Sequence, residues 1–299
     1  MSLGSPGAAN PLDSAALTRH PNQVASKQPA QIKHAQAAAV AAAKSAGALL
    51  RRHLHREKQA HEITQHDIKL DLDVRTQHLI EQRLRSAMPI AAVLGEEGIV
   101  GDPQAEFRWV VDPIDGTVNF AYGIPHACVS IALQRRALRP SATTYPDGYD
   151  TLLGVVYDPF LDELWTALRG GPARLNGRTV RVSRRRLLGD AVLSIGFAKT
   201  HENLEATLPY FIQLTHRVRK LRIMGSAALA LTYVGTGRFD AYLERGIRLW
   251  DIAAGGLIVE CAGGRFWRQP LADPYAYRML ASNRLLHRHL APGFTAAAP

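Results

Sequence analysis

Residues Trp109–Phe120 read Trp-Val-Val-Asp-Pro-Ile-Asp-Gly-Thr-Val-Asn-Phe, a pattern that places two acids at the end of a buried strand. The first three residues are apolar and favour β structure, as in a strand that is covered on both faces. Pro113 keeps Asp112 out of the helical conformation and has no N–H of its own. Asp115 and Gly116 form a turn pair, because Gly116 can adopt backbone angles that other residues avoid. We therefore expect a strand that ends in a tight turn carrying two carboxylates.

The oxygen atoms of this turn are the ligands that hard cations prefer. Asp112 and Asp115 flank Ile114, whose backbone carbonyl is free to serve as a third oxygen ligand. Mg²⁺ is bound by such oxygen sets. Beyond the turn, the N–H groups of Gly116 and Thr117 are placed as in phosphate-binding loops. The alternative is an ordinary surface turn, since Asp-Pro and Asp-Gly pairs are common in loops.

Composition limits the classes of protein that this chain can belong to. Its 299 residues, 46% of them hydrophobic, are enough for one large core or for two fused subdomains. The net charge of +10 favours anionic ligands such as phosphate esters, nucleic acid or a membrane surface. Lys and Arg are scattered, and no cluster is interleaved with aromatic residues as in a nucleic-acid-binding face. We therefore attribute most of the charge to a solvated surface.

The cysteines and the N-terminal sequence predict where in the cell the protein is found. Cys128 and Cys261 lie in apolar runs and are expected to be buried thiols in a reducing environment, not a disulfide. The N-terminus lacks a basic-then-apolar signal peptide, and apart from Ala-rich helix no segment is apolar for long enough to span a membrane. We expect a soluble, cytoplasmic protein without a membrane partner.

The first third of the chain predicts a tail and two helices. Residues 1–31 are rich in Gly, Ser, Pro, Ala and Asn without periodicity, so we expect a disordered or loosely attached tail. Residues 32–57 are rich in Ala and other helix formers. A second helix is expected to open within Asp67–Asp73, with Asp73 as its N-cap. A cap is the simplest role of Asp73, although its second carboxylate oxygen could turn toward a metal or a bound water.

A second pair of acids also follows a predicted strand. Residues 91–94 are apolar and lead directly to Glu96 and Glu97. Because neighbouring strand residues face opposite ways, only one of the two should reach a shared site. An acidic solvated loop is the alternative. Farther on, residues 127–133 read as a buried strand, and residues 135–152 read as a polar loop containing proline.

Strands and helices alternate from Gly189 onward, which predicts a layered α/β core. The expected strands are residues 191–196, 220–224 and 239–244, and the expected helices are residues 201–216, 226–233 and 249–260. Ser226 and Asp251 are expected as the N-caps of the last two helices.

Four motifs, taken in order, resemble those of the inositol monophosphatase family: Gly95-Glu96-Glu97, Trp109–Phe120, Gly225-Ser226-Ala227-Ala228 and Trp250-Asp251. The family belongs to the Mg²⁺-dependent, lithium-sensitive phosphatases, which include the fructose-1,6-bisphosphatases. The resemblance covers the chain from about residue 32 to the end. It implies an α/β layered sandwich (α-β-α-β-α) of two fused subdomains. We expect residues 32–187 to hold most metal ligands and residues 188–299 to complete the substrate pocket.

The resemblance also implies roles for individual residues. The ligands of two Mg²⁺ ions would be Glu96, Asp112, the Ile114 carbonyl, Asp115 and Asp251. The catalytic group would be Glu96, Asp73 and Thr117, of which Asp73 and Thr117 orient the attacking water. The substrate would be bound by Asp115, Gly116, Thr117, Gly225, Ser226, Ala227, Glu244 and Asp251.

The chain departs from the family pattern at three places. The residues before Asp73 read Asp67-Ile-Lys-Leu-Asp-Leu, where the family has a Lys loop, so a third metal at Asp73 stays open. Arg248 precedes Trp250-Asp251, and we hypothesise that it contacts a second anionic group on the substrate; a solvated arginine is the alternative. The loop at residues 135–152 is longer than the family pattern suggests.

By resemblance, the expected activity is hydrolysis of a phosphate monoester of inositol or a related polyol, by metal-activated water and without a covalent intermediate. Fructose 1,6-bisphosphate and 3′-phosphoadenosine 5′-phosphate are alternative substrates. An alternative of another class is a regulatory protein on the same fold that binds nucleic acid or a partner protein, which the net charge motivates. We do not expect nucleic acid as a partner, because every expected metal ligand is present. The resemblance implies a homodimer.

Overall fold

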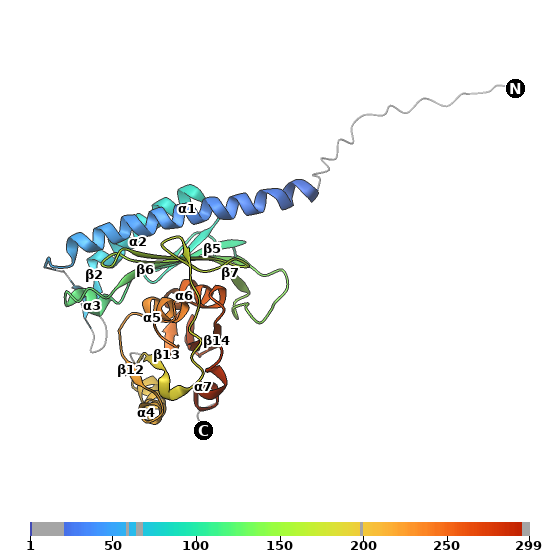
Figure 1. Ribbon diagram of the computed structural model, residues 1–299. Coiled ribbons are helices and arrows are strands. Elements are labelled where there is room, and N and C mark those ends of the chain that lie inside the picture. The colour runs from blue at the N-terminus through green and yellow to red at the C-terminus, as the bar shows by residue number, and fades with distance from the viewer. Residues whose placement is uncertain (2–20, 58–59, 64–67, 198–199, 295–299) are drawn as a thin grey trace.

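A computed structural model describes residues 1, 21–57, 60–63, 68–197 and 200–294, and the side chains of these residues except 21–29, 60–63, 68 and 69. The chain forms five layers (Figure 1). Helices α1 (Pro21–His53) and α2 (Asp71–Ala87) cover one face of a large sheet, and α5 (Ala227–Gly235) and α6 (Leu249–Cys261) separate that sheet from a smaller one. Helices α4 (His201–Thr215) and α7 (His287–Phe294) cover the far face of the smaller sheet. The predicted α-β-α-β-α sandwich is confirmed.

The large sheet has eight strands, and its central strand β5 carries the motif at Trp109–Phe120. In spatial order the strands are β10 (Arg178–Thr179), β9 (Arg174–Leu175), β8 (Glu163–Leu168), β7 (Tyr149–Asp158), β6 (Cys128–Arg136), β5 (Phe107–Asp115), β3 (Ala92–Gly95) and β4 (Gly98–Val100). Only β3 and β5 are parallel. Strand β5 is buried along its whole length because α2 contacts it from one side and α6 from the other.

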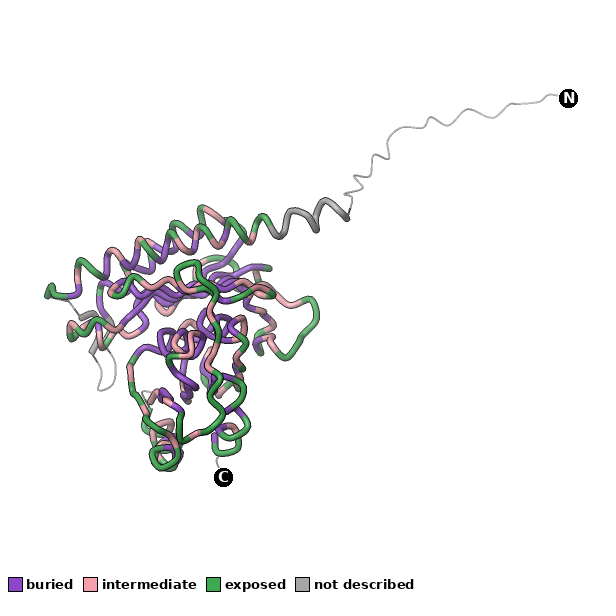
Figure 2. The backbone as a smooth tube through the Cα atoms, viewed as in Figure 1, coloured by how far each residue is buried: buried purple, intermediate pink, exposed green. Residues whose placement is uncertain are grey.

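The smaller sheet has five strands, in the order β12 (Lys220–Arg222), β11 (Val192–Ile195), β13 (Ala241–Arg248), β15 (Ala276–Ser282) and β14 (Arg265–Pro270). Strand β11 is parallel to β12 and β13, and the remaining pairs are antiparallel. Strands β1 (Ala60–Ile63) and β2 (Ile68–Leu70) form a separate antiparallel pair. The buried backbone concentrates in the large sheet and in α5 and α6 between the sheets (Figure 2).

The close approach of α6 to the large sheet depends on a glycine. A Cβ atom added to Gly154 in β7 would lie 2.7 Å from the carbonyl oxygen of Ala254 in α6. Any larger residue would therefore push the helix away from the sheet, and the helix carries Asp251 at its first turn.

Two predictions about the first helices are wrong in detail. Helix α1 begins at Pro21, so the predicted tail at 1–31 overlaps the helix. Helix α2 begins at Asp71 after a short strand, and its N-cap is Leu70 rather than Asp73. Asp73 instead accepts a hydrogen bond at 2.7 Å from the Leu70 N–H, the contact that an acid three residues into a helix makes. Asp67 lies outside the described residues, and the division at residues 187 and 188 stays a prediction.

Strand β5 also continues past its predicted end at Val111. It runs to Asp115, and its pairing with β6 is irregular between Asp112 and Asp115. Pro113 fits this position because it has no N–H to give to the ladder. The predicted loop at 135–152 is shorter, since β6 and β7 pair as far as Arg136 and Tyr149.

Because His287 is buried, the free energy of unfolding should depend on pH. His287 is 4% exposed, its Nδ1 lies 3.1 Å from the Ser282 Oγ, and burial lowers the pKa of its imidazole to about 4. The unfolded chain therefore binds a proton at His287 below about pH 6.5, while the folded protein does not. Above that pH, protonation of His287 should not reduce the free energy of unfolding. By about pH 5 the free energy of unfolding should have fallen by about 2 kcal/mol. Urea unfolding across this range should show the loss, and H287Q should remove it.

Candidate active site

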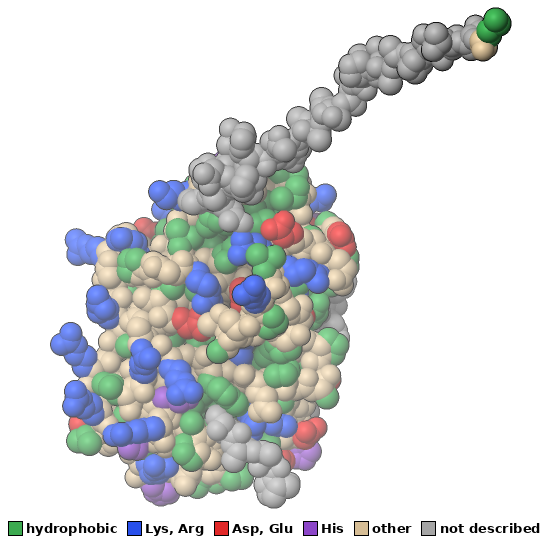
Figure 3. All heavy atoms as spheres, turned by 90° about the vertical axis from the view of Figure 1, so that its right-hand side faces the viewer, with side chains coloured by type: hydrophobic (Ala, Val, Ile, Leu, Met, Phe, Trp, Pro, Cys, Tyr) green, Lys and Arg blue, Asp and Glu red, His purple; other side chains and the backbone are tan. Residues whose placement is uncertain are grey.

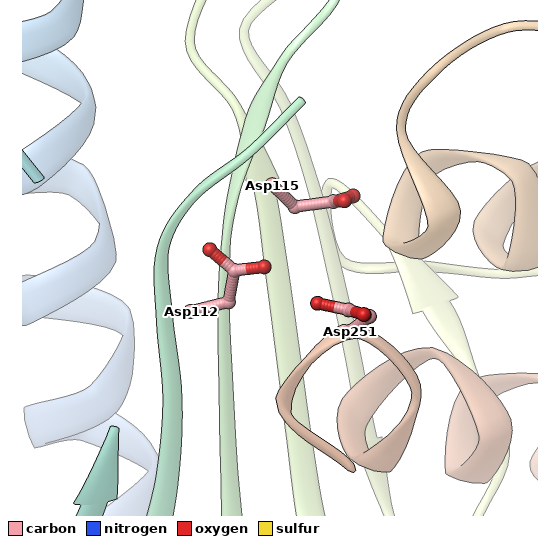
Figure 4. A group of neighbouring side chains, drawn as sticks. All are labelled: Asp112, Asp115 and Asp251. Carbon is pink, nitrogen blue, oxygen red and sulfur yellow. The ribbon is translucent and has the colours of Figure 1, made fainter. Parts of the chain in front are cut away.

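Three carboxylates from two distant segments converge at the end of β5. Asp112 and Asp115 extend from β5, and Asp251 extends from the first turn of α6 (Figure 4). One oxygen of each lies within 4.8 Å of the others. Asp112 and Asp115 are buried and Asp251 is partly buried, so the three carboxyl groups face one another largely out of contact with solvent.

Asp115 is held by the N-terminus of α5. Its carboxylate accepts hydrogen bonds from the Ser226 hydroxyl, from the Ala227 N–H at 3.1 Å and from the Ala228 N–H at 2.7 Å. The Cys128 thiol adds a weak contact at 3.5 Å. Burial raises the pKa of Asp115, and these donors oppose the rise. Ser226 is also the N-cap of α5, as expected, so the helix start and the carboxylate orient each other.

Asp251 occupies the third position of α6 rather than the predicted N-cap, which is Arg248. One carboxylate oxygen of Asp251 accepts the Arg248 N–H at 2.9 Å. Asp73 in α2 makes the same contact, because an acid three residues inside a helix can bond the N–H of the capping residue. Burial, followed by the charge of Asp115, raises the pKa of Asp251 to about 7.

Of the three aspartates, Asp112 has the surroundings that most strongly oppose a negative charge. One oxygen accepts the Ile114 N–H at 3.0 Å, and the carboxyl is hydrogen-bonded to that of Asp251. Its pKa is raised well above the usual value, first by burial and then by the charges of Glu96, Asp115 and Asp251. Bound divalent cations would remove this repulsion. Because every donor is oxygen, the group fits a hard cation such as Mg²⁺.

The two acids after β3 have different surroundings. The Glu96 N–H donates to the Val111 carbonyl at 3.2 Å, and its side chain lines the cavity above the three aspartates. The Glu97 N–H donates to the Gln77 side chain at 3.1 Å. Of the two, Glu96 alone is among the described residues that line the cavity, as the family resemblance implies.

This cavity has a volume of about 280 Å³ and lies between the end of β5, the start of α5 and strands β11 and β13. Every predicted site residue except Asp73 lines it: Glu96, Asp112, Ile114, Asp115, Gly116, Thr117, Gly225, Ser226, Ala227, Glu244 and Asp251. Its size is near the lower end of ligand pockets. Asp73 is buried in the first turn of α2, and its role stays a prediction.

The turn after β5 has the conformation that its glycine predicts. Gly116 has φ of +97°, and a Cβ added there would lie 2.9 Å from the His126 carbonyl oxygen. It precedes the short helix α3 (Thr117–Ala121). The Thr117 hydroxyl donates to the Ile114 carbonyl at 2.8 Å, so this side chain is already fixed at the cavity wall.

Two further residues line the cavity and were not predicted as site residues from the sequence; each fixes the position of a neighbouring part of the cavity wall. The Asn119 amide donates to the His126 carbonyl at 2.9 Å and to the Met224 carbonyl at 2.8 Å, which ties α3 to the segment at Gly225. The Tyr242 hydroxyl donates to Glu244 and fixes that carboxylate. Asn119 lies within the quoted motif, so its position was a usable signal, whereas Tyr242 had none.

Glu244 also depends on a residue without a side chain. A Cβ added to Gly196 would lie 1.8 Å from a Glu244 oxygen, so G196A must displace this carboxylate. We expect KM for a polyol phosphate to rise about tenfold, as for a lost hydrogen bond to substrate, with little change in folding. G189A is the matched control, because nothing lies within 4 Å of an added Cβ there. Steady-state kinetics that gave both variants the same KM would contradict this role of Gly196.

Arg248 already has protein partners. Its Nη1 donates to the Pro274 carbonyl at 3.0 Å, and its Nη2 lies 3.9 Å from an Asp273 oxygen. A second substrate anion would have to compete with these contacts, and the proposed anion contact of Arg248 stays a hypothesis.

Comparison with known proteins gives a consistent set of relatives. Residues 31–297 match the inositol monophosphatase family. A Xylella fastidiosa protein named Nus factor SuhB is 40% identical over 229 residues, which are 75% of this chain and 78% of that protein. An inositol-1-monophosphatase from Rhizobium meliloti is 43% identical over 197 residues, 64% of this chain and 68% of that protein. The crystal structure of the extragenic suppressor protein SuhB from Bartonella henselae has a TM-score of 0.77 and 32% identity, and the match covers 87% of this chain and 98% of that one.

Proposed function

Because the chain belongs to the inositol monophosphatase family, and is thereby a phosphatase, we propose that it hydrolyses phosphate monoesters of inositol or a related polyol with Mg²⁺ as cofactor. The observation that supports this best is the convergence of Asp112, Asp115 and Asp251 on one buried point. Each carboxylate accepts at least one backbone N–H, but their burial and their mutual charges raise the pKa of Asp112, and a bound cation would relieve this unfavourable interaction.

The proposed division of labour follows from the contacts at the site. Glu96, Asp112, Asp115, Asp251 and the Ile114 carbonyl would hold the cations. When bound, divalent cations supply a water of lowered pKa and stabilise the leaving oxygen. Thr117 would orient the attacking water at the cavity wall, and the part of Asp73, which lies in α2 and does not line the cavity, stays a prediction. Glu244, Asp115 and the segment Gly225–Ala227 would bind the hydroxyl groups of the polyol. We propose no covalent intermediate.

A substrate panel tests this proposal. Phosphate release should be measured from myo-inositol 1-phosphate, fructose 1,6-bisphosphate and 3′-phosphoadenosine 5′-phosphate, with Mg²⁺, with EDTA and with Mg²⁺ plus Li⁺. We expect release that requires Mg²⁺, is fastest for the inositol ester and falls when Li⁺ is added. The absence of Mg²⁺-dependent release from every ester would overturn the proposal.

A second candidate function is a regulatory one, which the relatives named Nus factor SuhB leave open. Between Glu163 and Asp190 the chain has no acidic residue but seven arginines: Arg169, Arg174, Arg178, Arg181, Arg184, Arg185 and Arg186. All but Arg169 are exposed. On the face shown in Figure 3, Lys and Arg side chains are also widespread. This segment would contact nucleic-acid phosphates without reading sequence.

A salt titration separates the two functions. If the segment binds RNA, the logarithm of the affinity should fall linearly with the logarithm of salt concentration, with a slope of about −0.7 per phosphate neutralised. R181A/R184A should reduce the slope and leave phosphatase activity unchanged. No RNA binding at low salt would remove the regulatory candidate in this form.

We also propose a cytoplasmic homodimer. Among the described residues, no helix combines the length and apolar character needed to cross a membrane. Light scattering of the purified protein tests the dimer.

A further inference from the structure

A second chamber adjoins the proposed catalytic cavity. It has a volume of about 390 Å³. The two spaces share five lining residues: Glu96, Phe197, Glu244, Ile247 and Asp251. The outer wall of the second chamber comes from the start of α4, the junction of β13 with α6, and the chain before β15, and its residues include Thr200, Asn203, Arg248, Trp250, Leu271 and Asp273. A ligand that reacts in the first space can therefore extend into the second.

The charges of the second chamber do not suit a second phosphate. Glu244 stands at the junction of the two spaces, and Asp273 lies on the outer wall. Arg248, the cation among the described lining residues, donates to the Pro274 carbonyl and lies near Asp273. Counting only the described residues that line the chamber, and with the remaining shared acids assigned to metal, two carboxylates face the guanidinium of Arg248, which already has protein partners. An additional dianion would be repelled here.

The remaining groups suit an uncharged ring with hydroxyl substituents. The Asn203 amide donates to the Thr200 hydroxyl at 2.8 Å and accepts from the Arg245 guanidinium at 2.9 Å, so its orientation is fixed. Phe197 and Trp250 add two aromatic side chains to the lining. A sugar ring has apolar C–H faces and hydroxyl edges, which match aromatic faces and polar side chains respectively.

We infer that the second chamber binds an uncharged, hydroxyl-bearing group, such as a sugar ring, attached to the polyol of the substrate. The substrate class then includes glycosylated polyol phosphates, and bisphosphates are disfavoured. This inference rests on the proposed phosphatase function and adds the part of the substrate that determines specificity.

Competition between substrates tests the inference. Phosphate release should be compared for myo-inositol 1-phosphate, a glucosyl-myo-inositol 1-phosphate and fructose 1,6-bisphosphate. For the wild-type protein, we expect kcat/KM for the glucosyl ester to equal or exceed kcat/KM for myo-inositol 1-phosphate. We expect kcat/KM for the bisphosphate to be lower than kcat/KM for myo-inositol 1-phosphate by about tenfold or more. Hydrolysis of the simple ester but not of the glucosyl ester would overturn the inference alone. No release from any ester would overturn the phosphatase function as well.

Two variants locate the effect in the second chamber. L271W should fill the space and lower kcat/KM for the glucosyl ester about tenfold, with little change for the simple ester. L187W, at a side chain that is 68% exposed, is the matched control. D273K should leave kcat/KM for the simple ester unchanged. It should raise kcat/KM for the bisphosphate several-fold, which is about the effect of one exposed charge contact. Equal effects of L271W on both inositol esters, or no effect of D273K on the bisphosphate, would contradict the inference.

Discussion

Replacing Asp112 with Asn is expected to lower kcat/KM on the order of 10³-fold and to stabilise the metal-free protein at neutral pH. The loss of activity follows from the proposed role of Asp112 as a metal ligand. The gain in stability follows from its surroundings, because burial and the charges of Glu96, Asp115 and Asp251 all raise the pKa of its carboxyl. An amide of the same shape removes that repulsion and can donate a hydrogen bond to Asp251.

The two effects are measured in separate experiments. Thermal unfolding in EDTA should give D112N a melting temperature a few degrees above wild type. Added Mg²⁺ should raise the melting temperature of wild type, by preferential binding to the folded state, and leave D112N almost unchanged. The control is D102N, an exposed acid whose contact with the Gln104 N–H an amide can keep. A D112N protein that is less stable than wild type in EDTA would show that Asp112 stabilises the fold, against our reading of the site.

The apparent affinity for Mg²⁺ is expected to fall steeply as pH falls from about 7 to about 5, by tenfold per unit for each proton displaced. In the metal-free protein, burial and the charge of Asp115 raise the pKa of Asp251 to about 7, and the pKa of Asp112 is raised well above its usual value. Below these pKa values the carboxyls carry protons that a cation must displace. The loss over the range should therefore be about 10²-fold or more.

Mg²⁺ titrations of phosphate release at fixed pH give this slope, and calorimetry in buffers of different ionisation enthalpy gives the number of protons released. D251N should release fewer protons when Mg²⁺ binds, because the carboxyl of Asp251 is absent.

The same carboxyls should make the metal-free protein lose stability as pH rises, because their pKa values in the folded protein are raised. This effect is opposite in sign to that of His287. A Mg²⁺ affinity that does not change between these pH values would show that the acids are already ionised without metal, contrary to the expectation from their burial.

The part of the candidate site at the end of β5 could be predicted from the residues themselves because its chemistry is local in sequence, whereas the roles of Glu96, Glu244 and Asp251 were implied by the family resemblance. Pro113 and Gly116 constrain the backbone of their own segment, so the oxygen ligands around them are predictable without knowledge of the fold. The positions of Asp73 and Asp251 were predicted less well. An acid that caps a helix and an acid three residues inside it both accept a backbone N–H at the helix start, and the sequence pattern does not distinguish the two.

The sequence by itself determined the strand that carries Asp112 and Asp115 and the α/β layering, because these follow from short-range backbone preferences and from residue chemistry, and the resemblance of its motifs to a family identified the other acids of the site. The tertiary structure decided which surfaces meet. The clash that Gly196 avoids arises because β11 lies parallel beside β13, which brings Gly196 against Glu244. The second chamber forms where α4, the β13–α6 junction and the chain before β15 come together. Contacts between segments so far apart depend on how the layers pack, and no local pattern encodes them.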